Sequence, residues 1–121
     1  MSSVRLKGLH HVQVAMSEGA EDVARAFYGG RLGLMERPKP DALYRRGGVW
    51  FEGEGISFHI GVETDFRPAR KAHVAFAVED LAAARKALAD LDPTDIDSLP
   101  DWRRFYVADP FGNRIEILQQ N

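Results

Sequence analysis

The stretch HVQVAM at residues 11–16 decides the architecture of this chain, because HVAFAV at residues 73–78 repeats it. Histidine, valine and alanine occupy the same offsets in both stretches, and such valine-rich runs are typical of strands. Each run leads into apolar residues at helical spacing. The chain is therefore predicted to contain two copies of one structural unit.

The order of predicted elements is the same in both halves. The first half is predicted to contain a strand at 9–16, a helix with apolar positions Ala20, Val23, Ala24, Phe27 and Tyr28 that ends at Gly29-Gly30, and strands at 34–37, 48–51 and 56–60, with a turn at 52–55. The second half is predicted to contain a strand at 72–78, a helix from an N-cap at Asp80 to Asp92-Pro93, a short strand within 94–99, and strands at 104–107 and 114–118. Both halves are βαβββ modules, at about 5–63 and about 71–121, and they form a single domain of the α+β class.

Composition and charge exclude several classes of protein. The chain has 121 residues, 45% of them hydrophobic, which fits one domain with its own core. A net charge of −2 gives no indication of a nucleic-acid partner, and no apolar run approaches the roughly 20 residues of a membrane span. The first residues lack the apolar stretch of a secretory signal, so we expect a cytoplasmic protein. The absence of cysteine excludes disulfides, zinc–thiolate sites and thiol catalysis.

Four side chains capable of binding a metal fall at related places in the two halves. If the halves are equivalent, His11 matches His73, and His59 on the strand at 56–60 matches Glu116 on the strand at 114–118. Imidazole nitrogen and carboxylate oxygen suit Zn²⁺, Ni²⁺, Fe²⁺, Mn²⁺ or Co²⁺. The four residues predict one divalent ion per site, with coordination positions left open for water or substrate.

Each of these residues also has a simpler interpretation. A lone histidine on a strand is usually structural, and His10 must face away from His11 if alternation holds, so that only one of them lines the site. Glu116 between Ile115 and Ile117 also fits an outward-facing charge on a half-buried strand. The joint placement of all four donors favours the metal site.

Three motifs resemble one family. GLHHVQVA at 8–15 with FYGGRLGL at 27–34, KAHVAFAV at 71–78, and DPFGNRIEI at 109–117 resemble the opening, middle and closing motifs of the glyoxalase / bleomycin-resistance / extradiol-dioxygenase (vicinal oxygen chelate) superfamily. The resemblance implies two βαβββ modules whose mixed sheets curl around a metal-binding cleft. It implies His11, His73 and Glu116 as metal ligands, with His59 at a fourth position that is often Glu or Gln. It also implies a homodimer, in many members with the site built from both chains.

The resemblance further implies a metal-dependent lyase, isomerase, transferase or dioxygenase that acts on a small, oxygen-rich, anionic molecule. Glu116 is then the candidate catalytic residue, because a metal-site carboxylate moves the proton from a C–H next to a carbonyl in glyoxalase-like members. Candidate substrate contacts are Gln13, on the face of His11, and the arginines Arg67, Arg70 and Arg104. The basic segments also fit solvated surface.

Two other functions remain open from the sequence. The first is a non-catalytic small-molecule-binding dimer of the bleomycin-resistance kind, whose members often lack the ligands that this chain keeps. The second is a structural domain that binds no metal. Among enzymes, a thiol-transferring antibiotic-resistance enzyme shares the two histidines and the glutamate, and extradiol dioxygenases use Fe²⁺ with the same set but are usually longer.

Overall fold

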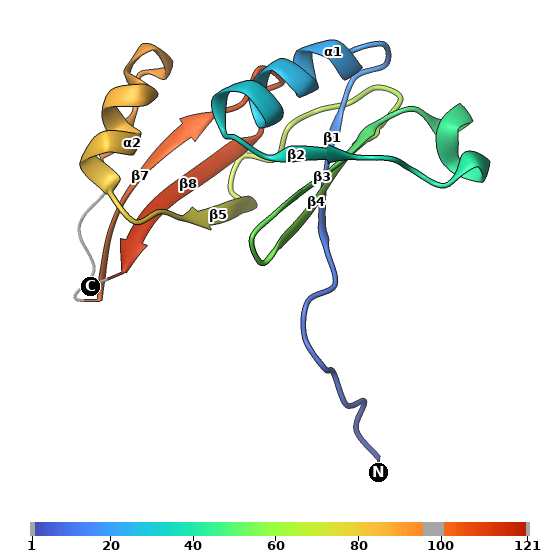
Figure 1. Cartoon of the computed structure of the whole chain (residues 1–121), viewed down its shortest axis with the longest axis horizontal. Coiled ribbons are helices and arrows are strands. Elements are labelled where there is room, and N and C mark those ends of the chain that lie inside the picture. The colour runs from blue at the N-terminus through green and yellow to red at the C-terminus, as the bar shows by residue number, and fades with distance from the viewer. Residues whose placement is uncertain (1, 96–100, 121) are drawn as a thin grey trace.

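The computed structural model describes residues 2–95 and 101–120, which form two four-stranded mixed sheets (Figure 1). The first sheet has the order β1-β4-β3-β2 and the second β5-β8-β7-β6. The strands are β1 Val12–Met16, β2 Met35–Arg37, β3 Val49–Gly53, β4 Ile56–Val62, β5 His73–Ala77, β6 Thr94–Asp95, β7 Trp102–Ala108 and β8 Arg114–Gln120. The helices are α1 Glu21–Ala24, continued by a π-helical segment Arg25–Arg31, then α2 Leu81–Ala87, and 3₁₀ helices at Asp41–Arg46 and Ala89–Leu91.

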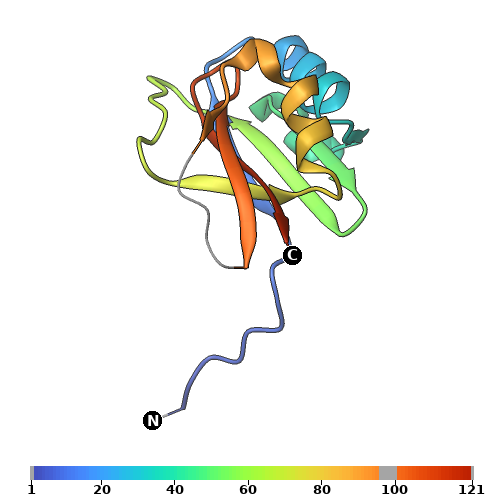
Figure 2. The same cartoon turned by 90° about the vertical axis from the view of Figure 1, so that its left-hand side faces the viewer.

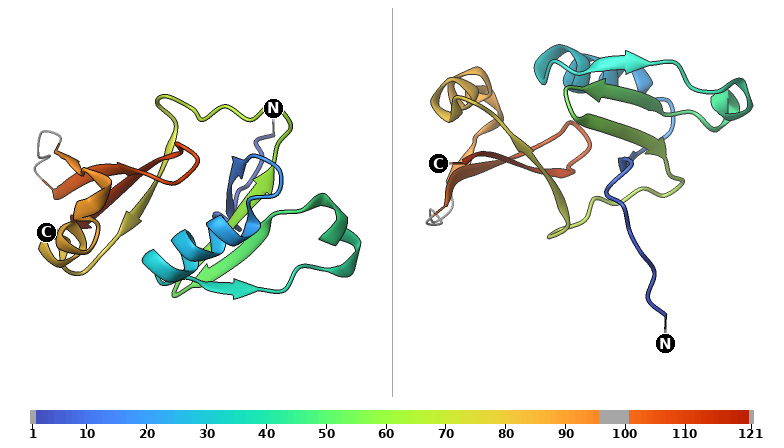
Figure 3. Two further views of the ribbon diagram at one scale, coloured as in Figure 1. Left: turned by 90° about the horizontal axis from the view of Figure 1, so that it is seen from above. Right: turned by 60° about the horizontal axis from the view of Figure 1, so that its bottom comes forward.

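The pairing register confirms the internal repeat. In each sheet the first strand runs parallel to the last, with Val12 opposite Phe58 in one half and Val74 opposite Ile115 in the other. His59 and Glu116 follow Phe58 and Ile115 directly, so the two residues are equivalent, as the sequence predicts. Among the described residues no strand of one sheet pairs with a strand of the other, and the two sheets lie side by side without closing (Figure 3).

The first helix differs from its prediction at its C-terminal end. It continues through Gly29-Gly30 to Arg31 as a π-helical turn, in which the Leu32 amide donates to the Phe27 carbonyl at 3.0 Å. The left-handed residue that lets the chain turn back is Gly33, at φ 75°. The glycine pair therefore does not end the helix, and the 3₁₀ helix Asp41–Arg46 was not predicted at all.

The second helix begins as predicted. The Asp80 carboxylate accepts a hydrogen bond from the Ala83 amide at 3.0 Å, which is an N-cap. After the 3₁₀ turn, Asp92 takes the left-handed conformation at φ 52° and ends the helical segment. Of the strand expected within 94–99, Thr94–Asp95 is formed as β6, and positions 96–99 lie outside the described residues.

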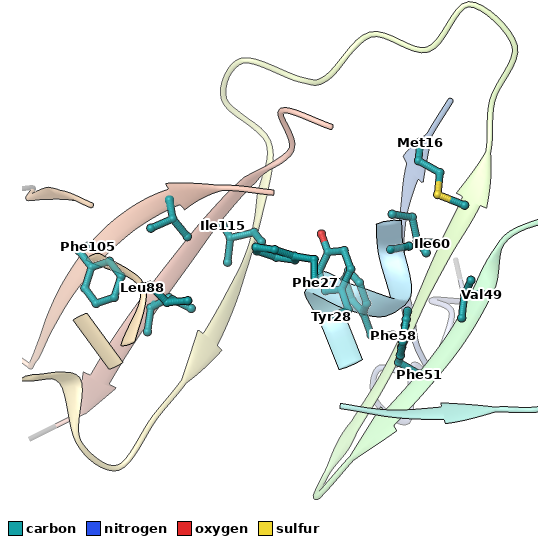
Figure 4. Packing of buried hydrophobic residues seen from close by; sticks show 13 residues of the cluster. Met16, Phe27, Tyr28, Val49, Phe51, Phe58, Ile60, Leu88, Phe105 and Ile115 are labelled. Atoms are coloured by element: carbon teal, nitrogen blue, oxygen red, sulfur yellow. The ribbon is translucent and has the colours of Figure 1, made fainter. Parts of the chain in front are cut away.

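Each sheet packs one face against its own helix, and the apolar side chains of both halves join in one cluster (Figure 4). Phe27 and Tyr28 of the first helix lie between the two sheets. The ring of Phe58 contacts that of Phe76 with 5.5 Å between centroids. The two modules therefore share one hydrophobic core and are not joined by the connecting segment alone.

A buried polar contact also joins the modules, and it explains two of the family motifs. The Tyr28 hydroxyl donates to Asp109 Oδ2 at 2.5 Å. Asp109 also accepts hydrogen bonds from the Phe111 and Asn113 amides, and the Asn113 side chain donates to the Ala15 carbonyl at 2.8 Å. The FY and DPFGN motifs are thus the two sides of one inter-module contact, which fixes how the sheets sit relative to each other.

The first strand is shorter than predicted. β1 begins at Val12, and residues 2–11 have no regular secondary structure; the N-terminal part of this segment extends away from the body of the protein (Figure 2), whereas His11 still contacts His59. Residues 9–11 were expected to be part of the strand. The parallel pairing with β4 begins at Val12 opposite Phe58, although β4 itself begins two residues earlier, at Ile56.

Candidate functional site

The first pair of predicted ligands lies on the exposed side of the first sheet, opposite the face that packs on α1. His59 is opposite Gln13 on β1 and opposite Trp50 on β3, so these three side chains share that side. His11 precedes the strand, and its ring stacks on that of His59 with centroids 4.3 Å apart. We call the side of each sheet that faces away from its α-helix the donor face of that sheet.

Stacking on both sides buries His59. The Trp50 ring lies 4.1 Å from the His59 ring at an interplanar angle of 5°, so the imidazole is held between Trp50 and His11. His59 is 6% exposed. Burial lowers the pKa of His59 below that of a free imidazole, and the nearby His11 and Arg37 lower it further. The ring is therefore neutral at neutral pH, which is the form that binds metals.

The second pair lies on the donor face of the second sheet. His73 Nε2 is 3.1 Å from Glu116 Oε1, and Glu116 is 4% exposed. Glu116 alternates with Ile115 and Ile117, as the sequence predicts. The alternative, in which this carboxylate faces solvent, is wrong, because other side chains on the donor face cover it. The coverage comes from Tyr106 and Arg104 on β7.

Glu116 Oε1 collects three donors. The Tyr106 hydroxyl donates to it at 3.0 Å and Arg104 Nη1 at 3.3 Å, in addition to His73. Burial raises the pKa of Tyr106, and so does its bond to Glu116, so the phenol stays protonated and remains a donor. Among the described residues, the buried Nε of Arg104 has no hydrogen-bond partner.

Two cavities open beside the donor pairs, and both have basic side chains in their walls. A cavity of about 480 Å³ is lined by Arg70, Tyr106 and Arg114, and the Arg114 guanidinium lies 3.9 Å from the centre of the Tyr106 ring. A cavity of about 180 Å³ on the first sheet is lined by Gln13 and Trp50, and its basic residues are Lys39 and Arg46.

The predicted substrate contacts divide between these places. Arg70 and Gln13 line the cavities, and Arg104 contacts Glu116 directly, whereas Arg67 is exposed on the connection between the modules and does not line the larger cavity. The sequence prediction did not include Arg114, and it assigned no specific contact to Tyr106 or Trp50, which it counted only among aromatic residues that could line the core or the pocket. Arg114 could have been found, since it lies two residues before Glu116 and therefore shares its face.

His10 does not turn away from His11 as predicted. The two Nδ1 atoms are 2.9 Å apart, and both rings line one cavity of about 170 Å³. The alternation rule fails because both residues precede β1 and are not in a strand.

One chain does not bring the two donor pairs together. Over residues 2–95 and 101–120, no three His, Asp or Glu side chains are close enough to hold one metal ion. The structure therefore forms two pairs, His11 with His59 and His73 with Glu116, each on the donor face of its own sheet. His11 of the first pair lies next to the edge strand β1, and His73 of the second pair is part of the edge strand β5.

This fold, with its repeat and motifs, identifies the protein class. The sequence model of the glyoxalase-like domain family matches residues 13–118. The chain belongs to this family, within the vicinal oxygen chelate superfamily. Members of this superfamily commonly use a divalent metal and bind small molecules.

Solved structures agree with this assignment. A protein assigned to the glyoxalase family from Bacillus anthracis is 44% identical, with a TM-score of 0.91 over 99% of this chain and 100% of that one. A glyoxalase/dioxygenase from Nostoc punctiforme is 20% identical, with a TM-score of 0.75 over 100% and 99%. The fosfomycin resistance protein FosX from Listeria monocytogenes is 15% identical, with a TM-score of 0.72 over 97% and 96%. The last two share the fold.

The remaining comparisons are negative. No curated protein matches the sequence. In the described ranges, none of the helices has the length and apolar character that crossing a bilayer requires.

Proposed function

We propose that this protein is a divalent-metal-dependent enzyme acting on a small anionic, oxygen-rich molecule, and that two copies of the chain build each site. His11 and His59 of one copy and His73 and Glu116 of a second copy would hold the ion. The observation that carries the proposal is the division of one donor set into two equivalent pairs, each beside an edge strand. The buried Tyr28–Asp109 and Asn113–Ala15 contacts hold the modules of one chain in place, so a second chain is the simpler source of the missing pair.

The donors fit a catalytic metal site. Three imidazoles and a carboxylate are nitrogen and oxygen ligands for Zn²⁺, Ni²⁺, Fe²⁺, Mn²⁺ or Co²⁺. The lowered pKa of His59 keeps its nitrogen free of a proton at neutral pH. When bound, the ion would supply Lewis acidity that stabilises negative charge developing on two substrate oxygens.

Glu116 is the proposed catalytic residue. Its Oε1 is held by Tyr106, Arg104 and His73, so the carboxylate orientation is fixed before substrate arrives. A positioned carboxylate in a covered site can take the proton from a C–H next to a carbonyl. Tyr106 stays protonated and would serve as a positioning residue, because its hydroxyl donates to Glu116 Oε1.

The charges around Glu116 support an anionic substrate. Arg70 and Arg114 line the cavity that reaches Tyr106, and Arg104 Nη1 lies 3.3 Å from Glu116 Oε1. Guanidinium groups bind carboxylate and phosphate-like groups through paired hydrogen bonds. These arginines would hold the charged end of the substrate while its other oxygens reach the ion.

A cytoplasmic location stays a prediction.

Metal analysis of purified variants tests the ligand set. We expect about one divalent ion per chain in the wild type, and a loss in His11→Ala, His73→Ala and Glu116→Ala. The control is Glu63→Ala, an exposed carboxylate on the connection between the modules, which should keep its metal. Full metal content in His73→Ala, or none in wild type refolded with each candidate ion, refutes the proposal. A dimer without metal that binds small molecules points instead to the bleomycin-resistance kind of function.

Mixing two variants tests whether the site is shared. His11→Ala and His73→Ala each damage both sites of their own homodimer. In a mixed dimer, both changes fall in one site and the other site is intact. Random mixing makes about half of the dimers mixed, so about a quarter of the wild-type metal content should return. If each site lies within one chain, co-refolding restores nothing.

A further inference from the structure

The N-terminal segment, residues 2–11, carries apolar side chains that nothing in the described chain covers. Val4, Leu6 and Leu9 are 84%, 87% and 90% exposed. The segment is extended and leaves the body of the protein from the start of β1 (Figures 1 and 2). Continued as a strand, it would place Val4 and Leu6 on the same side as Val12, the side that packs on helices. Three exposed apolar residues on one extended segment indicate a docking element.

A matching surface lies at the edge strand β5. In the described chain β5 pairs only with β8, and Val78 continues that ladder by donating to the Leu118 carbonyl at 2.8 Å. By alternation, Ala75 and Ala77 direct their amide and carbonyl groups to the open edge. Beside that edge is a cavity of about 120 Å³ that is lined by apolar residues, including Leu32, Phe76 and Val78. Apolar cavities of roughly this size take up small apolar groups and stay dry.

We propose that residues 4–10 of one copy add as an antiparallel strand to the open edge of β5 in a second copy, with Leu6 entering the apolar cavity. The proposal rests on the shared site proposed above, because that site sets the register. A parallel strand would run along the residues before β5, away from the cavity. The antiparallel direction brings the segment along Ala77 and Val78, where the cavity lies.

The register follows from placing His11 opposite the partner's His73. Counting five residues in opposite directions then places Leu6 opposite the partner's Val78, on the helix-packed side where the cavity opens. Gly8 falls opposite the partner's Phe76 and leaves room for that ring. Arg5 falls opposite the partner's Glu79, which adds an opposite-charge pair. Side-chain size or charge is therefore complementary at three of the opposed residue pairs.

Engineered cysteines test this register in a chain that has none of its own. The Val78 amide bonds to β8, so Leu6 and the partner's Val78 form a non-hydrogen-bonded pair with Cα atoms about 4.5 Å apart. That spacing permits a disulfide. The metal-free Leu6→Cys/Val78→Cys protein, oxidised with glutathione, should run as a covalent dimer on non-reducing gels. The matched control Lys7→Cys/Val78→Cys faces the other side and should cross-link at least about tenfold more slowly.

The outcomes separate this proposal from the proposed function. A disulfide within one chain, no cross-link, or equal cross-linking of the control overturns the docking of residues 4–10, even if the mixed-variant metal test succeeds. A covalent dimer in a protein that binds no metal supports the docking and refutes the metal site. Substitution of Leu6→Asp gives a second readout, because it should raise the dimer dissociation constant at least about tenfold in sedimentation, whereas Lys7→Asp should not.

Discussion

Replacement of Tyr28 by phenylalanine removes the buried bond between the modules and little else. The Tyr28 hydroxyl donates to Asp109 at 2.5 Å, and both residues are buried. A hydrogen bond to a charged acceptor contributes about 1.5–3 kcal/mol. Asp109 keeps its bonds from Phe111 and Asn113, so the carboxylate is not left without partners. We therefore expect Tyr28→Phe to lower the free energy of unfolding by about 2 kcal/mol.

Urea unfolding at one fixed protein concentration measures this loss, because the dimer proposed above would make stability depend on concentration. In a domain of this size, about 2 kcal/mol corresponds to a fall in Tm of about 8 °C. The control is Tyr44→Phe, since Tyr44 is 57% exposed, and it should change stability by less than about 0.5 kcal/mol. A Tyr28→Phe protein as stable as this control would refute the role given to the contact.

Three further predictions concern single side chains. The pKa of His59 is lowered in the folded state, so the unfolded state takes up the proton at higher pH than the folded state does. The free energy of unfolding should therefore fall as pH drops below about 6.5. In urea titrations, His59→Gln should flatten this dependence of stability on pH between about pH 7 and 5.5. Asp80→Ala removes the cap of α2 and should cost about 1 kcal/mol in the same assay, whereas a loss below about 0.3 kcal/mol would show that the cap contributes little. Arg114→Ala should weaken protection by anions such as phosphate in thermal shift measurements while metal content stays unchanged, and Arg103→Ala, on the other face, should leave that protection intact.

The repeat and the strand order were predictable because they depend on local patterns. The matching runs at 11–16 and 73–78 fix which strands are equivalent, and the observed register places His59 and Glu116 at corresponding positions. The N-cap at Asp80 was likewise predicted, because capping needs only residues that are close in sequence. The end of the first helix was not, since the π-helical turn at Arg25–Arg31 depends on packing against β3 and β4.

The surroundings of the candidate donors were not predicted from the sequence. Which side chains cover Glu116 is decided by the partner strand, and β7 brings Tyr106 and Arg104 there through a pairing that no local pattern specifies. The alternation around Glu116 also fitted a solvent-facing charge, but on the second face of this sheet Tyr106, Arg104 and His73 hydrogen-bond to this carboxylate and cover it. The distance between the two donor pairs is likewise a property of how the modules pack, through contacts such as Tyr28 with Asp109.

The two tryptophans give this protein an optical probe on each sheet. Trp50 is stacked on His59, and Trp102 lies on the same strand face as Tyr106, so one indole sits on each donor face. Excited-state quenching by a paramagnetic ion falls off steeply with distance, and emission from Trp50 should respond to Ni²⁺ or Co²⁺ far more than emission from Trp102. Titration of a protein that keeps Trp50 as its only indole would thus follow occupancy of the shared site in solution and without a label, and the matched protein that keeps only Trp102 would serve as the reference.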